Sequence, residues 1–68
     1  NKKLRLRCIR IIAELTKEDE KRAEQRLEET GGSIRLAVLM ARRGLALDEA
    51  RRRLEACRGV LRDALELT

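Results

Sequence analysis

The chain contains no histidine, no proline and no aromatic residue, and it has only two cysteines and one methionine. Without histidine it lacks the side chain that most often serves as a base at neutral pH. Two cysteines without histidine make neither a zinc site nor a cysteine–histidine nucleophile. The lack of aromatic rings excludes the base stacking by which proteins hold single-stranded nucleic acid. The sequence therefore predicts no catalytic residue, no metal ligand and no cofactor.

What is present favours an all-α fold. Leucine, alanine, arginine and glutamate dominate the 68 residues, and all four are strong helix formers. Charged and apolar residues each make up 43%, so the composition is not that of a disordered chain. The length allows one domain with a small core. No run approaches the roughly 20 apolar residues that span a bilayer, so we expect no membrane partner.

The net charge of +5 is unevenly distributed. Residues 1–13 carry five bases and no acid, whereas residues 14–29 carry seven acids and four bases. A basic face indicates an anionic partner, such as a phosphate, a nucleic acid or an acidic protein surface. Solvated helix faces are the alternative interpretation.

Cys8 and Cys57 are expected to be free thiols, as in a reducing compartment, which here means the cytoplasm. Cys8 falls on an apolar stripe and is expected in the core. The chain begins with Asn1 rather than methionine. We therefore expect residues 1–68 to be a single helical domain taken from a longer protein.

Hydrophobic periodicity predicts a compact bundle of about five short helices, without a tandem repeat. Their expected ranges are 2–15, 17–29, 34–43, 47–57 and a short stretch after Gly59. The helix over 34–43 is almost wholly apolar and should be central. The first helix carries two apolar clusters, one of Leu4, Cys8, Ile11, Ile12 and Leu15, the other of Leu6, Ile9 and Ala13. We expect the second cluster to contact another domain, and Lys3, Arg7 and Arg10 to form a basic edge between the two clusters.

Turn residues separate these helices. Thr16 is expected to cap the second helix. Gly31 and Gly32 end that helix, Ser33 caps the next, and Gly44 ends the third. Arg35, in the first turn after Ser33, offers a weak anion contact beside free N–H groups, although a cap and a solvated arginine explain the same residues. The doublet is too short for a phosphate-binding fingerprint.

Nucleic-acid binding is a role that the residues themselves allow to be weighed. The helices around Gly44 resemble a helix-turn-helix, but the fourth helix has few of the Asn and Gln residues that read bases. Nucleic-acid binding, which would be non-specific, is therefore less favoured than the other functions considered below. Such binding would have an affinity that falls steeply as the salt concentration rises.

A further set of residues occurs in a fixed order along nearly the whole chain. It comprises Asn1-Lys2-Lys3-Leu4, Arg7, Arg10-Ile11, Gly31-Gly32-Ser33-Ile34-Arg35-Leu36-Ala37, Met40-Ala41, Gly44-Leu45, Glu49-Ala50, Leu54, Gly59, Leu61-Arg62 and Ala64-Leu65. In this order and spacing the chain resembles the C-terminal helical domain of the bacterial N-acetylmuramic acid 6-phosphate etherases, and the related lid of glucokinase regulatory protein. Arg35 stands where the family more often has lysine, Arg58 where a second glycine is more common, and Cys8 where alanine is expected.

The resemblance implies a ubiquitin-associated-like core and a parent enzyme with an N-terminal sugar isomerase domain. That enzyme cleaves the lactyl ether of N-acetylmuramic acid 6-phosphate to N-acetylglucosamine 6-phosphate and D-lactate in cell-wall recycling. Its catalytic glutamates lie in the other domain. The helical domain is then an accessory lid with dimer contacts, and Lys3 is the residue expected to reach the sugar phosphate, with Asn1 positioning the start of the chain.

The alternatives implied by the same resemblance are a regulatory sugar-phosphate-binding lid and a ubiquitin-associated-like module that binds proteins. Protein binding in that fold commonly uses a hydrophobic first loop. The loop around Thr16 is polar, which argues against the protein-binding alternative.

Overall fold

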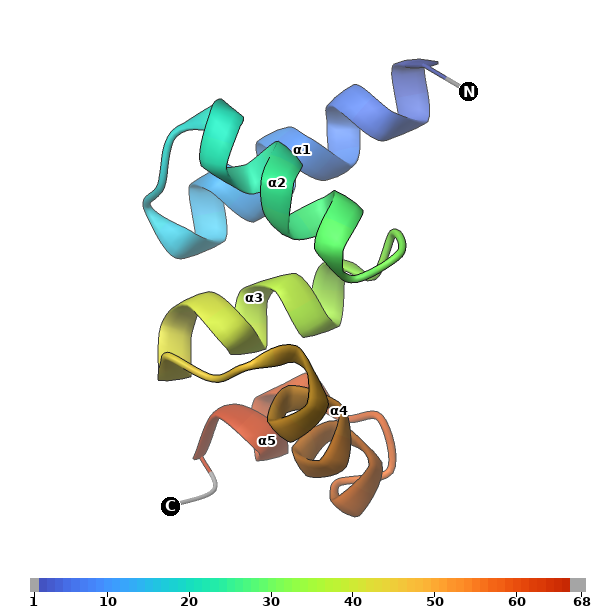
Figure 1. Cartoon of the computed structure of the whole chain (residues 1–68), viewed down its shortest axis with the longest axis vertical. Helices are drawn as coiled ribbons and strands as arrows, with labels where there is room; N and C mark the ends of the chain where they lie inside the picture. Colours follow the sequence, from blue (N-terminus) through green and yellow to red (C-terminus); the bar gives the residue numbers. More distant parts are fainter. Residues whose placement is uncertain (1, 67–68) are drawn as a thin grey trace.

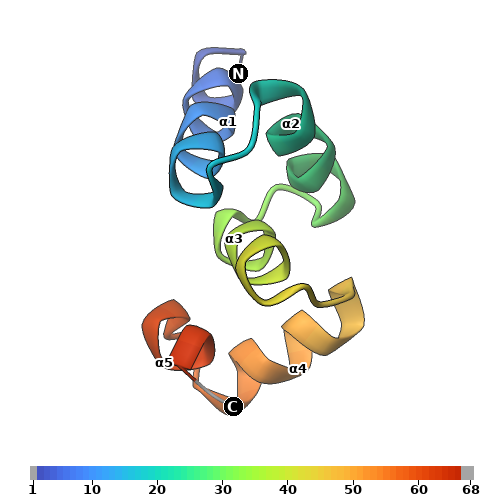
Figure 2. The ribbon, with the colours of Figure 1, turned by 90° about the vertical axis from the view of Figure 1, so that its left-hand side faces the viewer.

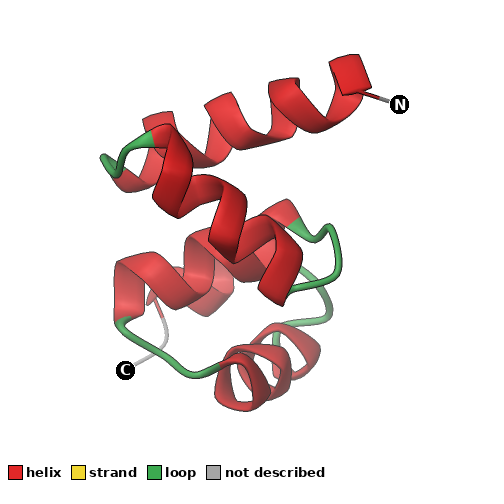
Figure 3. Ribbon diagram, turned by 45° about the horizontal axis from the view of Figure 1, so that its top comes forward, coloured by secondary structure: helices red, strands yellow, loops and turns green. Residues whose placement is uncertain are grey.

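The computed structural model describes residues 2–66, and this part of the chain folds into five α-helices without a strand (Figure 3). The helices are α1 (Lys2–Thr16), α2 (Glu20–Glu29), α3 (Ile34–Arg43), α4 (Leu47–Ala56) and α5 (Leu61–Glu66). The expected all-α bundle of five short helices is confirmed. Asn1 lies outside the described residues.

Helix α3 is the centre of the molecule, as its apolar sequence predicts. In Figure 1 it crosses the middle, with α1 and α2 at one end and α4 and α5 at the other. Figure 2, turned by a quarter, shows the same three levels. Helix α3 contacts all four other helices. Its sides belong to two different cores, so α1, α2 and α3 form a first unit, and α3, α4 and α5 form a second unit.

Each unit has its own hydrophobic core. Ile9, Ile12, Ala23, Leu27 and Ala37 are buried in the first core. The buried residues of the second core are Leu36, Leu39, Met40, Ala50 and Ala64. Each core draws on all three helices of its unit, and α3 contributes Ala37 to the first and the three residues Leu36, Leu39 and Met40 to the second.

The two cores are related by a constant step of 27 residues. Four buried positions of the first core, each increased by 27, give buried positions of the second: Ile9 and Leu36, Ile12 and Leu39, Ala23 and Ala50, Ala37 and Ala64. The partly buried Ala13 and Ile34 correspond in the same way to Met40 and Leu61, and Leu27 corresponds to Leu54. The second unit therefore repeats the first, with α3 serving as the last helix of one and the first helix of the other.

The backbone repeats with the same step where α2 and α4 end. The amides of Gly31 and Gly32 donate to the carbonyls of Glu28 and Leu27, at 3.1 and 2.8 Å. Twenty-seven residues later, Arg58 and Gly59 donate to Glu55 and Leu54, at 3.0 and 2.8 Å. These are the paired bonds with which a Schellman turn satisfies the last carbonyls of a helix.

The expectation that the chain lacks a tandem repeat is thus wrong. Segments 23–37 and 50–64 share identical residues at seven aligned positions, namely Ala23, Arg26, Leu27, Glu28, Gly32, Arg35 and Ala37 with their counterparts. Helices α1 and α3 correspond in structure, yet their residues differ because α1 is exposed on a side where α3 is buried. A repeat that overlaps in one helix and changes its exposure leaves little identity to detect.

The start of α2 differs from the prediction, because Thr16 does not cap it. Thr16 is the last residue of α1, and its hydroxyl donates to the carbonyl of Ile12 at 2.7 Å. Lys17 then adopts a left-handed φ of 63° and turns the chain. Asp19 is the actual N-cap, since its carboxylate accepts from the amide of Arg22 at 2.8 Å. By contrast, Ser33 caps α3 by accepting from Leu36, and Gly44 ends α3 with a φ of 64°, both as predicted.

The two apolar clusters predicted on α1 are also wrong in their membership. Ile9 belongs to the first core together with Ile12, whereas Leu4 and Leu15 are exposed. The helix therefore buries a face centred between the two predicted clusters and leaves apolar residues of both clusters on the surface. Cys8 and Cys57 are half-buried free thiols, as expected; Cys57 follows α4, which ends at Ala56.

Arg58 occupies the position of Gly31 in the repeated turn, with a φ of 56° against 71° for the glycine. A side chain in this left-handed region costs about 1 kcal/mol, whereas glycine adopts it freely. We expect Arg58→Gly to raise the free energy of unfolding by up to about 1 kcal/mol, measured by urea denaturation followed by circular dichroism. Arg52→Gly, inside α4, is the control and should be destabilising; a loss of stability in both variants would contradict the assignment.

Candidate functional site

The exposed side of α1 carries a shallow groove of about 380 Å³. Its lining residues are Lys3, Leu6, Arg7, Arg10, Ile11 and Glu14, and we call this surface the outer face of α1. It combines three cations with two apolar side chains and one acid. The outer face is therefore suited to a ligand or partner that is anionic and partly apolar.

The three cations of the outer face follow one line along the helix. Lys3, Arg7 and Arg10 are four and then three residues apart, which places them on successive turns of one side. The rise from Lys3 to Arg10 is about 10 Å, at about 1.5 Å per residue. Within residues 2–66, the guanidinium groups of Arg7 and Arg10 have no hydrogen-bond or ion-pair partner. The predicted basic edge is thus present.

Comparison with α3 shows that the fold does not require these charges. The positions equivalent to Arg7, Arg10 and Glu14 are Ile34, Ala37 and Ala41, and Ile34 and Ala37 pack into the first core. On α1 the same side faces outward, and charged residues therefore occupy the positions that are apolar in α3. Sequence reasoning identified Lys3 but gave Arg7 and Arg10 no separate role, and the 27-residue comparison is the signal that singles them out.

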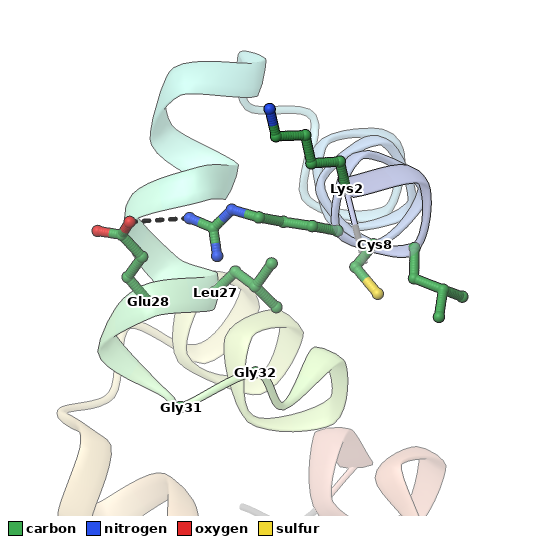
Figure 4. Close-up of a pocket in the computed structure, with 8 residues that line it drawn as sticks. Lys2, Cys8, Leu27, Glu28, Gly31 and Gly32 are labelled. Carbon is green, nitrogen blue, oxygen red and sulfur yellow. Dashed lines mark hydrogen bonds and ion pairs between the residues drawn. The ribbon is translucent and has the colours of Figure 1, made fainter.

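A second and larger groove, of about 610 Å³, lies between α1 and the turn from α2 to α3 (Figure 4). Leu4, Cys8 and Leu27 supply its apolar walls. Across it, Arg5 donates to Glu28 at 2.8 Å. The glycine doublet contributes backbone only. Because the amides of Gly31 and Gly32 already donate to carbonyls of α2, they are not available to hold a phosphate.

The repeat contains a counterpart of this second groove. Leu36, Arg51, Leu54, Glu55 and Gly59 line a groove of about 310 Å³, and three of them correspond to Leu27, Glu28 and Gly32. Grooves that recur at equivalent places of a repeat are a product of the fold. The outer face of α1 is therefore the more specific candidate for function.

Arg35, the other predicted anion contact, lies exposed in the first turn of α3. It does not line the outer face of α1, so the structure does not bring Arg35 and Lys3 to one site. At this helix start, Ser33 accepts from Leu36 at 3.2 Å, and the hydroxyl of Thr30 accepts from the amide of Ser33. The local polar groups thus serve the turn.

The charged residues of α2 and of the loop before it form ion pairs at the surface, as predicted. Glu18 accepts two hydrogen bonds from Arg26, at 2.5 and 3.0 Å, and lies 3.9 Å from Arg22. The hydrogen bond from Arg26 lowers the pKa of Glu18, aided by the charges of Arg26 and Arg22 and opposed by partial burial. The same bond raises the pKa of Arg26. This ion pair joins the loop between α1 and α2, which carries Glu18, to Arg26 of α2.

Because the pKa of Glu18 is lower in the folded chain than in the unfolded one, the pair stabilises the fold above the unfolded pKa. That stabilisation is lost as the pH falls through the folded pKa. We expect Glu18→Gln to lower the free energy of unfolding by about 1 kcal/mol at pH 7 and by nothing at pH 2. Urea denaturation at both pH values measures this, with Glu20→Gln as the control; an equal effect at both pH values would contradict the ion-pair explanation.

Within the part of the chain that the structure describes, no three His, Cys, Asp or Glu side chains gather as a metal site would need. Nor does any of these helices have the length and apolar character to cross a membrane.

The described residues thus define an all-α domain in which two three-helix units share α3, with a cationic groove on the exposed side of α1. Comparison with known proteins finds a similar segment in several larger proteins. The chain is 43% identical over 65 residues to the N-acetylmuramic acid 6-phosphate etherase of Synechococcus sp. (strain CC9605), and 40% identical over 65 residues to that of Rhizobium rhizogenes. It is 38% identical over 65 residues to the enzyme of that name from Deinococcus radiodurans.

Each of these alignments covers 96% of this chain but 21% of the relative. The chain thus matches a C-terminal segment of the N-acetylmuramic acid 6-phosphate etherase family, and it spans about a fifth of the length of these relatives. No protein-family model matches the chain, and no solved structure does. The resemblance noted from the sequence is confirmed for the etherases.

Proposed function

We propose that this chain is the accessory C-terminal domain of a cytoplasmic N-acetylmuramic acid 6-phosphate etherase, acting within a homodimer as a lid over the sugar-phosphate site of a sugar isomerase domain. The observation that carries the proposal is the similarity of almost the whole chain to a fifth of several etherases. A segment of this size, without histidine or a metal-binding cluster among its described residues, is suited to assist a reaction carried out elsewhere.

Lys3 is the proposed contact to the phosphate of the substrate. It lies exposed near the start of α1, on the outer face, where Arg7 and Arg10 extend the positive charge. An ammonium group meets a phosphate dianion as a compact point charge. Asn1, which we propose to position the start of the chain, falls outside the described residues.

The proposal is tested by measuring lactate release from N-acetylmuramic acid 6-phosphate. The 68-residue chain alone should release none, whereas the full-length etherase that carries this chain should be active. In that etherase Lys3→Ala should raise KM about tenfold or more, because one charged contact to the substrate is lost. Lactate release by the isolated chain would refute the accessory role. A Lys3→Ala enzyme with unchanged KM, beside the control Lys17→Ala, would refute the phosphate contact.

The runner-up is a regulatory lid that binds a sugar phosphate without turnover, and the same groove supports it. Lactate release by the full-length protein decides between the two. A ubiquitin-associated-like protein-binding module is less favoured, because the first loop is charged and Glu18 in it is held by Arg26. Localised NMR shifts at Leu45 or Leu61 on titration with ubiquitin-like proteins would restore that alternative.

A further inference from the structure

We propose that the outer face of α1 binds both anionic groups of one sugar phosphate: the 6-phosphate at Lys3, and the carboxylate of the lactyl ether at Arg10, assisted by Arg7. This inference rests on the proposed function, and it names the residues that distinguish the substrate from its sugar product. Lys3 alone would bind substrate and product equally, since both carry the phosphate.

The substrate class named by the relatives carries two anionic groups at opposite ends of a pyranose ring. The phosphate is on C6, and the lactyl group on O3 ends in a carboxylate. Covalent bonds of about 1.5 Å place these anions on the order of 9 Å apart. The rise from Lys3 to Arg10 is about 10 Å, so one side of α1 matches that separation without bending.

The side chains at the two ends differ in the way these anions require. A guanidinium offers two parallel N–H donors that fit a carboxylate, and lysine offers a point charge that fits a phosphate. Within residues 2–66 no protein group forms a hydrogen bond or an ion pair with the guanidinium of Arg7 or Arg10. Both arginines are exposed, and they line the same groove as Lys3.

The remaining lining residues define the extent of the site. Glu14 lies one turn beyond Arg10 and reverses the sign of the charge, so the cationic line ends there. Leu6 and Ile11 flank the arginines and provide apolar surface for the ring and the lactyl methyl group. In the equivalent face of α3 the cations are replaced by Ile34 and Ala37, which pack into the first core. The cationic line is therefore particular to the exposed helix.

The experiment compares substrate and product in the full-length etherase that carries this chain. KM is measured with N-acetylmuramic acid 6-phosphate, and the inhibition constant with N-acetylglucosamine 6-phosphate, which keeps the phosphate but lacks the carboxylate. We expect Arg7→Ala/Arg10→Ala to raise KM about tenfold to a hundredfold and to change the inhibition constant less than twofold. Lys3→Ala should raise both constants together.

The matched control is Arg51→Ala/Arg52→Ala, which removes two exposed arginines from α4 and should change neither constant. An equal rise of both constants in the Arg7/Arg10 variant, or no rise in either, would overturn the inference. If Lys3→Ala changed neither constant, the phosphate contact of the proposed function would fail, while the ratio measured for the Arg7/Arg10 variant would still decide the carboxylate assignment.

Discussion

Replacing Leu39 by alanine is expected to lower the free energy of unfolding by about 3 kcal/mol, because a fully buried leucine leaves a cavity in addition to its lost transfer energy. Leu39 is 0% exposed in the second core and comes from the helix that both units share. The core of a domain of this size rarely supplies more than about 3–5 kcal/mol of stability. Loss of Leu39 should therefore unfold a large fraction of the chain at 25 °C.

Urea denaturation followed by circular dichroism at 222 nm measures the effect, with the slope of the transition showing whether both units unfold together. Ile12→Ala, at the equivalent buried position of the first core, should cost a similar amount. Leu6→Ala is the control, since Leu6 is 50% exposed and its removal should cost under about 0.5 kcal/mol. A loss below about 1 kcal/mol for Leu39→Ala would show that the second core contributes little.

The second expected result is that residues 1–45 alone do not form a stable monomer. Removing α4 and α5 exposes Leu36, Leu39 and Met40, which α3 buries in the second core. For each residue, about 1.5–3 kcal/mol of free energy from burying its side chain is lost. Three adjacent apolar residues exposed on one helix face also promote association. We expect weak helicity and concentration-dependent oligomers, measured by circular dichroism and light scattering.

The repeat indicates which substitutions would make residues 1–45 a stable monomer. The positions of α5 that correspond to Leu36 and Leu39 are Asp63 and Glu66, both exposed. Terminal repeats commonly carry such a polar outer face. Residues 1–45 with Leu36→Asp and Leu39→Glu should therefore be a helical monomer, whereas a control with Arg42→Asp and Arg43→Glu should behave like the unmodified fragment. A stable monomer without the two changes would contradict the dependence of the first unit on the second.

The number, order and approximate ends of the helices follow from the sequence, because Gly44, Gly59 and the Gly31-Gly32-Ser33 turn each stop a helix through local conformation. The sequence does not show which residue caps α2, because Thr16 and Asp19 are both good capping residues. The structure has Asp19 as the cap, because the chain turns at Lys17, which has a left-handed φ. A lysine does not predict such a turn. Which side of α1 is buried could not be read from periodicity, since its apolar residues surround most of the helix.

The candidate site was predictable in part. The cluster of bases in the first thirteen residues pointed to α1, and the family resemblance selected Lys3. That Arg7 and Arg10 share one groove with Lys3 depends on which face α1 turns outward. That choice is made by packing of Ile9 and Ile12 against α2 and α3, which involves residues distant in sequence.

The repeat around α3 also has a consequence for how the chain folds. The main helix–helix contacts join helices that are one or two places apart along the chain. Loops that must close before these contacts form are short, so little conformational entropy is lost in advance of the stabilising contacts. Chains of such low contact order fold in microseconds to milliseconds. This domain is therefore expected to reach its structure soon after its last helix has been synthesised.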